Sequence, residues 1–206
     1  MQFLLDNGTR SYRNGCDEGI NKTKRKEYFL QSVKYFIEAL GQANNGEQYV
    51  SIYRNLAMCY LKTSEIVNEK NDYYLSEGKN NQKYCKSLIG NTGIVYLSKC
   101  LDYGTRIKRP EDWLVDIQQK IQSSLVKMND CYSSEPSKKI GAFSNLVDRV
   151  TFPLAKSIIY IHSATTIFKS AVVDSEQKKY ASCSKKLEVT RVLPLNLTNC
   201  RTVFNL

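Results

Sequence analysis

Glycine, proline and histidine are scarce in this sequence. The 206 residues hold 10 Gly, 4 Pro and a single His, and none of the 7 Cys belongs to a CxxC pair. Few chain breakers favour long helices over many short strands. A histidine-rich metal site is excluded because His162 is alone, and the scattered cysteines lack the spacing of zinc ligands. The sequence therefore predicts a largely helical protein, and we expect neither a bound metal nor a cofactor.

Motifs for catalysis and for phosphate binding are missing as well. The segments GQANNG and GNTG lack the spacing and the Lys-Ser/Thr ending of a phosphate loop. His162 sits in the apolar segment IIYIHSATT, where a buried or half-buried structural histidine is expected rather than a catalytic base. The adjacent acids Asp17-Glu18 and Glu111-Asp112 fall at predicted helix starts, where they complement the helix dipole. We expect no enzymatic activity.

No uncharged apolar segment is long enough to cross a membrane. The longest apolar run, residues 154–173, contains Lys156, His162 and Lys169, and each such group costs roughly a few kcal/mol to bury in a bilayer. The N-terminal MQFLLDNGTR lacks the charged leader and apolar stretch of a signal peptide, and the odd number of cysteines is typical of reduced thiols. We therefore expect no membrane span and a cytoplasmic protein, with the nucleus as the alternative compartment.

Positive charge is what the chain has in excess. There are 30 Lys and Arg against 20 Asp and Glu, a net charge of +10, which permits attraction to nucleic acid or to acidic protein segments. The charge is spread along the chain, and its densest cluster lies in the polar stretch DEGINKTKRKE: Lys22, Lys24, Arg25 and Lys26. We interpret this stretch as a solvated loop, and its alternative role is a salt-sensitive phosphate contact.

Apolar residues at three-and-four spacing predict a series of helices. The pattern is clearest in the middle of the first half, where Val50, Tyr53, Leu56, Ala57 and Tyr60 share one face. Because Ala57 is small and stands between large rings, a neighbouring helix can approach closely there. We expect the rest of the chain to be organised around this helix.

Helices are also predicted before and after it. Residues 4–15 and 27–40 repeat the helical spacing, and Gly15 suits a helix C-terminus. Pro110 fits the first turn of the most regular helix, whose apolar stripe includes Ile117 and Leu125. We expect that helix to lie across the end of the stack.

The C-terminal part is less regular. Residues 133–139 are predicted to be a linker, and a helix with Leu154, Phe168 and Val172 on one face follows, although its β-branched residues leave a strand as the alternative. The predicted division is helical repeats at 1–130, linker and capping helices at 131–173, and a tail of unassigned structure at 174–206.

Residues 4–129 resemble tetratricopeptide repeats in the order of their small and aromatic positions. In the middle unit Ala57 and Tyr60 match the first helix and Tyr73 matches the second, and a third unit begins near Gly93. The resemblance implies an all-α fold, namely a short α-solenoid of helical hairpins with an extra C-terminal helix and an irregular tail. A generic antiparallel helical bundle is the alternative.

The resemblance also implies a function. Such modules are interaction scaffolds, or adaptors, that bind a peptide segment of a partner protein in a concave groove lined by the first helix of each pair. The candidate lining residues are mostly basic or amide, so the partner segment is expected to be acidic: Arg10, Arg13, Asn55, Cys59, Lys62, Asn91 and Lys99. Charge reversal at Arg13 and Lys62 is predicted to weaken binding.

The segment YRNLAMCYLK is similar to the middle repeat of co-chaperones that bind the acidic C-termini of large heat-shock chaperones. In that subgroup basic and amide side chains hold the terminal carboxylate, and Asn55 stands at one matching position. The other four matching positions hold residues without a positive charge: Leu5, Thr9, Ser87 and Asn91. A charge-assisted grip on a terminal carboxylate is therefore not expected.

Two other functions stay open. The cluster of Lys22, Lys24, Arg25 and Lys26 would suit a basic helical RNA-binding protein. A similar repeat module also precedes the catalytic domain of some SET-type lysine methyltransferases, so the chain could be a fragment of a larger enzyme. No catalytic motif of that family is visible after residue 130.

Overall fold

The computed structural model describes residues 1–67, 82–129 and 136–176, together with residues 182 and 184. None of these residues lies in a strand, so the predicted all-α class is confirmed for them. The helices are α1 (Gln2–Cys16), α2 (Lys22–Gly41), α3 (Gly46–Ile66), α4 (Gln82–Arg106), α5 (Glu111–Asn129), α6 (Pro136–Arg149) and α7 (Pro153–Glu176). The chain forms two compact units, Met1–Cys131 and Tyr132–Leu206.

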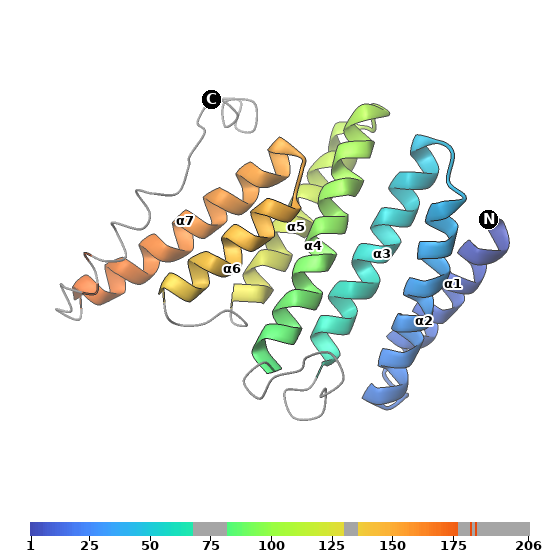
Figure 1. Cartoon of the computed structure of the whole chain (residues 1–206), viewed down its shortest axis with the longest axis horizontal. Helices are drawn as coiled ribbons and strands as arrows, with labels where there is room; N and C mark the ends of the chain where they lie inside the picture. The colour runs from blue at the N-terminus through green and yellow to red at the C-terminus, as the bar shows by residue number, and fades with distance from the viewer. Residues whose placement is uncertain (68–81, 130–135, 177–181, 183, 185–206) are drawn as a thin grey trace. The chain divides into compact units, whose positions relative to one another are not determined.

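In the first unit, helices that follow one another in sequence are neighbours in space (Figure 1). α1 packs on α2, α2 on α3, α3 on α4 and α4 on α5, and the α3–α4 interface is the most extensive. α1 also contacts α3, and Lys127 of α5 forms an ion pair with Glu65 of α3. α3 is therefore the central helix of this unit. The same order of neighbours would arise from stacked helical hairpins and from an antiparallel bundle.

Two asparagines start α2 and α3. The side-chain oxygen of Asn21 accepts a hydrogen bond from the backbone N–H of Lys24 at 2.9 Å, and that of Asn45 accepts one from Gln48 at 3.0 Å. Such caps satisfy N–H groups that the first turn of a helix leaves unpaired. Because Asn21 caps α2, the helix begins at Lys22, and the basic cluster that was interpreted as a loop is helical instead.

Glycines let α1 approach α2 closely. A Cβ at Gly8 would lie 2.7 Å from the ring of Phe36, and one at Gly15 would lie 2.7 Å from the ring of Phe29. Both phenylalanines are buried in the core. Gly15, predicted to stop the helix, is itself helical and has no positive φ. Its role here is to make room for a ring.

α3 and α4 meet in a close contact bordered by tyrosines. A Cβ at Gly93 would lie 2.7 Å from the side chain of Leu61 and 3.2 Å from the carbonyl oxygen of Ala57, which confirms the predicted close approach at Ala57. Five rings gather beside this contact with centroids 4.9 to 6.1 Å apart: Tyr49, Tyr53, Tyr60, Tyr96 and Tyr103. Aromatic pairs at such distances contribute about 0.5–1.5 kcal/mol each beyond their burial.

α4 is the described helix that packs most extensively on α3. The sequence suggested that α3 pairs with a helix containing Tyr73, and that α4 opens the next unit. Tyr73 lies outside the described residues, whereas α4 packs directly on α3. Residues of α4 that were expected to line a groove are therefore placed at the α3–α4 interface or near it.

α5 confirms the regular helix predicted after Pro110. Ile117, Ile121 and Leu125 are fully buried on the predicted stripe. The acidic residues of the first turn and Lys127 in the last turn complement the helix dipole. α5 packs against α4 along this stripe.

In the second unit α6 packs against α7. α6 begins at Pro136, so part of the linker predicted at 133–139 is helical. The predicted face of α7 is wrong, because Phe168 is 54% exposed and Val172 is 41% exposed. The buried stripe lies beside it: Ala155, Ile159, Ser163, Ile167 and Ala171. α7 is apolar over much of its circumference, so the spacing does not select one face.

Candidate functional site

The residues predicted to line a groove lie in different surroundings. Arg10 and Arg13 are exposed on α1, and Asn55 is half-buried on α3. Lys99 of α4 places its ammonium 5.5 Å from the ring centroid of Tyr53, a cation–π contact inside the tyrosine cluster. None of these four residues belongs to the lining of the cavity between α3 and α5.

Two of the predicted lining residues are buried in the first unit. Cys59 is 0% exposed, and its Sγ lies 3.2 Å from the Oγ of Ser32 on α2. Burial raises the pKa of the Cys59 thiol to about 12, so it is neutral at physiological pH. Asn91 of α4 is 7% exposed. Both side chains belong to the packing between helices and are closed to a partner.

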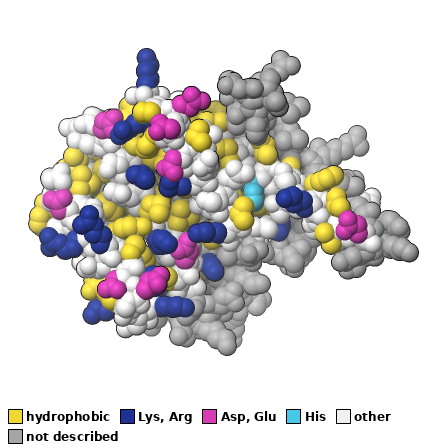
Figure 2. Space-filling model, turned by 180° about the vertical axis from the view of Figure 1, so that it is seen from behind, with side chains coloured by type: hydrophobic (Ala, Val, Ile, Leu, Met, Phe, Trp, Pro, Cys, Tyr) yellow, Lys and Arg dark blue, Asp and Glu magenta, His cyan; other side chains and the backbone are white. Residues whose placement is uncertain are grey.

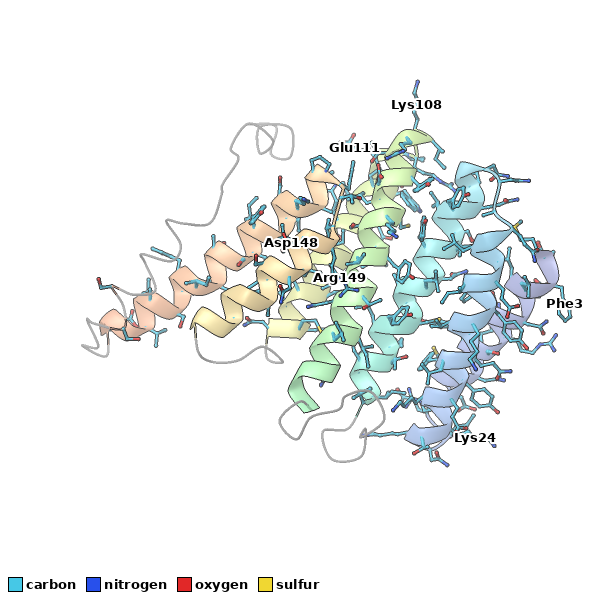
Figure 3. The ribbon with its side chains drawn as sticks, viewed as in Figure 1. Phe3, Lys24, Lys108, Glu111, Asp148 and Arg149 are labelled. Carbon is cyan, nitrogen blue, oxygen red and sulfur yellow. The ribbon has the colours of Figure 1, made fainter. Side chains whose placement is uncertain are left out.

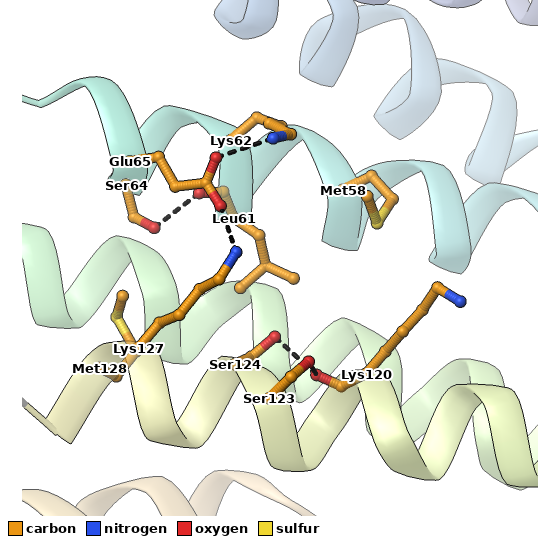
Figure 4. Close-up of a pocket in the computed structure, with 10 residues that line it drawn as sticks. All are labelled: Met58, Leu61, Lys62, Ser64, Glu65, Lys120, Ser123, Ser124, Lys127 and Met128. Carbon is orange, nitrogen blue, oxygen red and sulfur yellow. Dashed lines mark hydrogen bonds and ion pairs between the residues drawn. The ribbon is translucent and has the colours of Figure 1, made fainter.

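A cavity lies between α3 and α5. Its volume is about 140 Å³, similar to an engineered protein cavity of ~150 Å³ that binds benzene. Figure 4 shows the side chains around it. The lining residues are Met58, Leu61, Lys62, Ser64 and Glu65 of α3 with Lys120, Ser123, Ser124, Lys127 and Met128 of α5. We call this site the α3–α5 groove.

Positive charge from both helices surrounds one carboxylate in the α3–α5 groove. Glu65 accepts hydrogen bonds from the ammonium groups of Lys62 and Lys127, each at 2.8 Å, and Lys120 forms an ion pair with Asp116. Burial acts to raise the pKa of Glu65, but the hydrogen bonds from Lys127 and Lys62 outweigh it, so this pKa is lowered. The groove therefore holds three cationic side chains and one carboxylate among its lining residues.

The serine hydroxyls of the groove are used within their own helices. The Oγ of Ser64 donates to the carbonyl oxygen of Leu61 at 2.7 Å, and the Oγ of Ser124 donates to that of Lys120 at 2.7 Å. Ser123 donates to the same carbonyl at 3.1 Å. Their protons are thus committed, and the lysine ammonium groups are the stronger donors toward a ligand. Apolar surface comes from the methionines and leucine in the lining.

Sequence reasoning found Lys62 but missed its partners on α5. Lys120 and Lys127 are seven residues apart, a spacing that places both on one face of a helix. That signal is visible in the sequence. Spacing within one helix does not reveal that this face turns toward Lys62 of α3, because that is decided by packing between helices.

The basic cluster at the start of α2 is only partly exposed. Lys22 and Lys24 are exposed, and Lys24 lies at the end of the helix (Figure 3). The Nε of Arg25 donates to the carbonyl oxygen of Gly15 at 2.9 Å and so joins α2 to α1. Figure 2 shows one face of the molecule, where Lys and Arg side chains are interspersed with acidic and hydrophobic ones. No continuous basic stripe is visible on that face.

The second unit places His162 in a half-buried position. The ring of Phe143 meets it edge-on at 6.0 Å, and the Oγ1 of Thr166 lies 3.4 Å from its Nε2. Burial lowers the pKa of His162, and the charges of Lys139 and Lys169 lower it further. Within the described ranges, no group of three or more His, Cys, Asp and Glu side chains is placed to hold a metal ion.

Two further findings bear on the class of protein. Among helices that the structure describes, none has the length and apolar character needed to cross a membrane. In comparisons with known proteins, no protein-family model, no curated protein and no solved structure matches this chain.

Proposed function

We propose that this chain is a tetratricopeptide-like interaction module that binds an acidic peptide segment of a partner protein in the α3–α5 groove, and that it is not an enzyme. The observation that carries the proposal is the composition of the groove. Lys62, Lys120 and Lys127 come from two helices and surround a cavity of about 140 Å³ with apolar residues in its lining. A peptide with acidic side chains beside an apolar anchor complements this surface.

The geometry supports peptide binding over RNA binding through the basic cluster. In the α3–α5 groove three ammonium groups stand beside a cavity that can accept a side chain. In the cluster at the start of α2, the side chain of Arg25 is engaged with the carbonyl oxygen of Gly15 on α1. RNA binding is therefore the alternative outcome of the test.

A binding titration tests the proposal. The probe is a fluorescent peptide of about twelve residues in which glutamates alternate with leucines, chosen to match the charge and apolar surface of the groove. The control peptide replaces every glutamate with glutamine. We expect saturable binding of the acidic peptide, weaker at higher salt because exposed charges are screened, and little binding of the control.

Variants locate the site. Lys62→Glu with Lys127→Glu should weaken peptide binding by about tenfold or more, since each substitution replaces an attraction to the acidic peptide by a repulsion. Lys24→Glu with Lys34→Glu is the matched control, because it makes the same change in net charge at two exposed residues of α2. Equal losses in both pairs, or no saturable binding at low salt, would refute the proposal. Salt-dependent RNA binding lost in the Lys24 pair would support the alternative.

A further inference from the structure

Glu65 lies between two lysines of the α3–α5 groove. Its two oxygens divide between the helices: Oε2 lies 2.8 Å from the Nζ of Lys62, and Oε1 lies 2.8 Å from the Nζ of Lys127. Lys62 is three residues before Glu65 on α3, whereas Lys127 reaches it from α5. One carboxylate of the chain itself thus bridges the two cations (Figure 4).

The partial exposure of these three side chains allows another carboxylate to replace that of Glu65. The side chains of Lys62, Glu65 and Lys127 keep 38%, 34% and 64% of their surface exposed. Ion pairs with this much exposure contribute little to stability, because water and salt compete for both charges. Replacing one carboxylate by another between the same two cations leaves the number of charged contacts unchanged. The adjacent cavity can accept apolar parts of the incoming peptide.

We propose that Glu65 is an internal competitor, a built-in carboxylate that holds Lys62 and Lys127 until an aspartate or glutamate side chain of the partner takes its place. This inference rests on the proposed function, and it specifies both the ligand group and its contacts. Glu65 keeps the two ammonium groups side by side in the absence of a partner, and it makes weakly acidic segments poor ligands because they must displace it.

Glu65→Gln tests the inference with the same acidic peptide. Glutamine has nearly the shape of glutamate but no charge, so Lys62 and Lys127 no longer face a competing carboxylate at residue 65. We expect the affinity to rise about two- to fivefold, which corresponds to the measured range for exposed ion pairs. Glu65→Ala is the second variant. Unlike glutamine, alanine leaves no side-chain oxygen that could accept a hydrogen bond from the lysines. This variant should bind the peptide at least as tightly as the wild type.

Glu47→Gln is the matched control. Glu47 is also an exposed glutamate of α3 in an ion pair, with Arg109, but it does not line the groove. Its substitution changes the net charge equally, so a gain of similar size in Glu47→Gln would reveal a general charge effect and overturn the inference. Unchanged or weaker binding in both Glu65 variants would also overturn it, while wild-type binding that depends on Lys127 would leave the proposed function standing. If none of these proteins binds the peptide, the proposed function itself fails.

Discussion

Toward α4, helix α3 presents Ala57 and a row of tyrosine rings; toward α5, it presents Met58, Lys62 and Glu65. The first side leaves no room for a single Cβ at Gly93. The second side borders a cavity of about 140 Å³ and carries charges that remain partly exposed. The two sides belong to one helix of 21 residues.

The difference separates the side of α3 that stabilises the first unit from the side that we propose for binding. Closely packed interfaces lose dispersion contacts as soon as they separate, so they resist change. Exposed ion pairs around a cavity contribute little to stability and can exchange partners. We infer that the α4 side of α3 holds the unit together, and that the α5 side is available for recognition.

The largest expected effect is a difference in the free energy of unfolding between side-chain truncations on the two sides of α3. Tyr53→Ala removes a ring of α3 that is 8% exposed and lies 6.0 Å from the ring of Tyr96 on α4, and it should lower the free energy of unfolding by about 3–5 kcal/mol, because it leaves a cavity in the core. Met58→Ala, on the groove side of the same helix, should lower it by about 1 kcal/mol or less. Denaturant unfolding followed by circular dichroism measures both. Equal losses would contradict the proposed difference between the sides.

A smaller loss of stability is expected from overpacking at the α3–α4 contact. Gly93→Ala places a Cβ 3.2 Å from a backbone oxygen of α3, and overpacking of this kind costs about 1–3 kcal/mol, more than the gain of about 1 kcal/mol in helix propensity. Gly41→Ala is the control, since nothing lies within 4 Å of its Cβ position. We expect a lower melting temperature for the first variant and an unchanged or higher one for the second. Stabilisation by Gly93→Ala would show that the interface is loose.

The smallest expected effect is the contribution of Glu65 to stability as pH changes. Its pKa is lowered in the folded protein, so its contribution is present above the unfolded pKa of about 4.3 and is lost as pH falls through the folded pKa. Wild type should therefore lose slightly more stability than Glu65→Gln on acidification below about pH 4.5. Unfolding titrations at several pH values compare the two slopes. A large difference between these two slopes would mean that the ion pairs of the groove side contribute substantially to stability.

Sequence patterns predicted the helices where polar and apolar residues separate clearly. The stripe of α5 is confirmed because charged and amide residues cover the opposite side, and the close approach at Ala57 is confirmed because a small residue stands between large ones. The face of α7 was mispredicted because apolar residues surround it, so packing on α6 decides which stripe is buried.

The candidate site was predictable only in part for a related reason. Lys62 was identified, but Cys59, one helical turn away, is turned toward α2 and buried. Lys120 and Lys127 join Lys62 through the packing of α5 beside α3, a contact between residues about sixty positions apart in sequence. Periodicity describes the faces of single helices, whereas a groove depends on which faces meet.

The most direct test is to map the bound peptide on the two sides of α3 by nuclear magnetic resonance. Amide chemical shifts of isotope-labelled protein are followed as the glutamate–leucine peptide is added. We predict that the largest changes fall at Lys62, Glu65, Ser123 and Lys127, with little change at Tyr53 and Tyr96. Changes concentrated in the tyrosine cluster, or none along α5 at saturating peptide, would contradict the account.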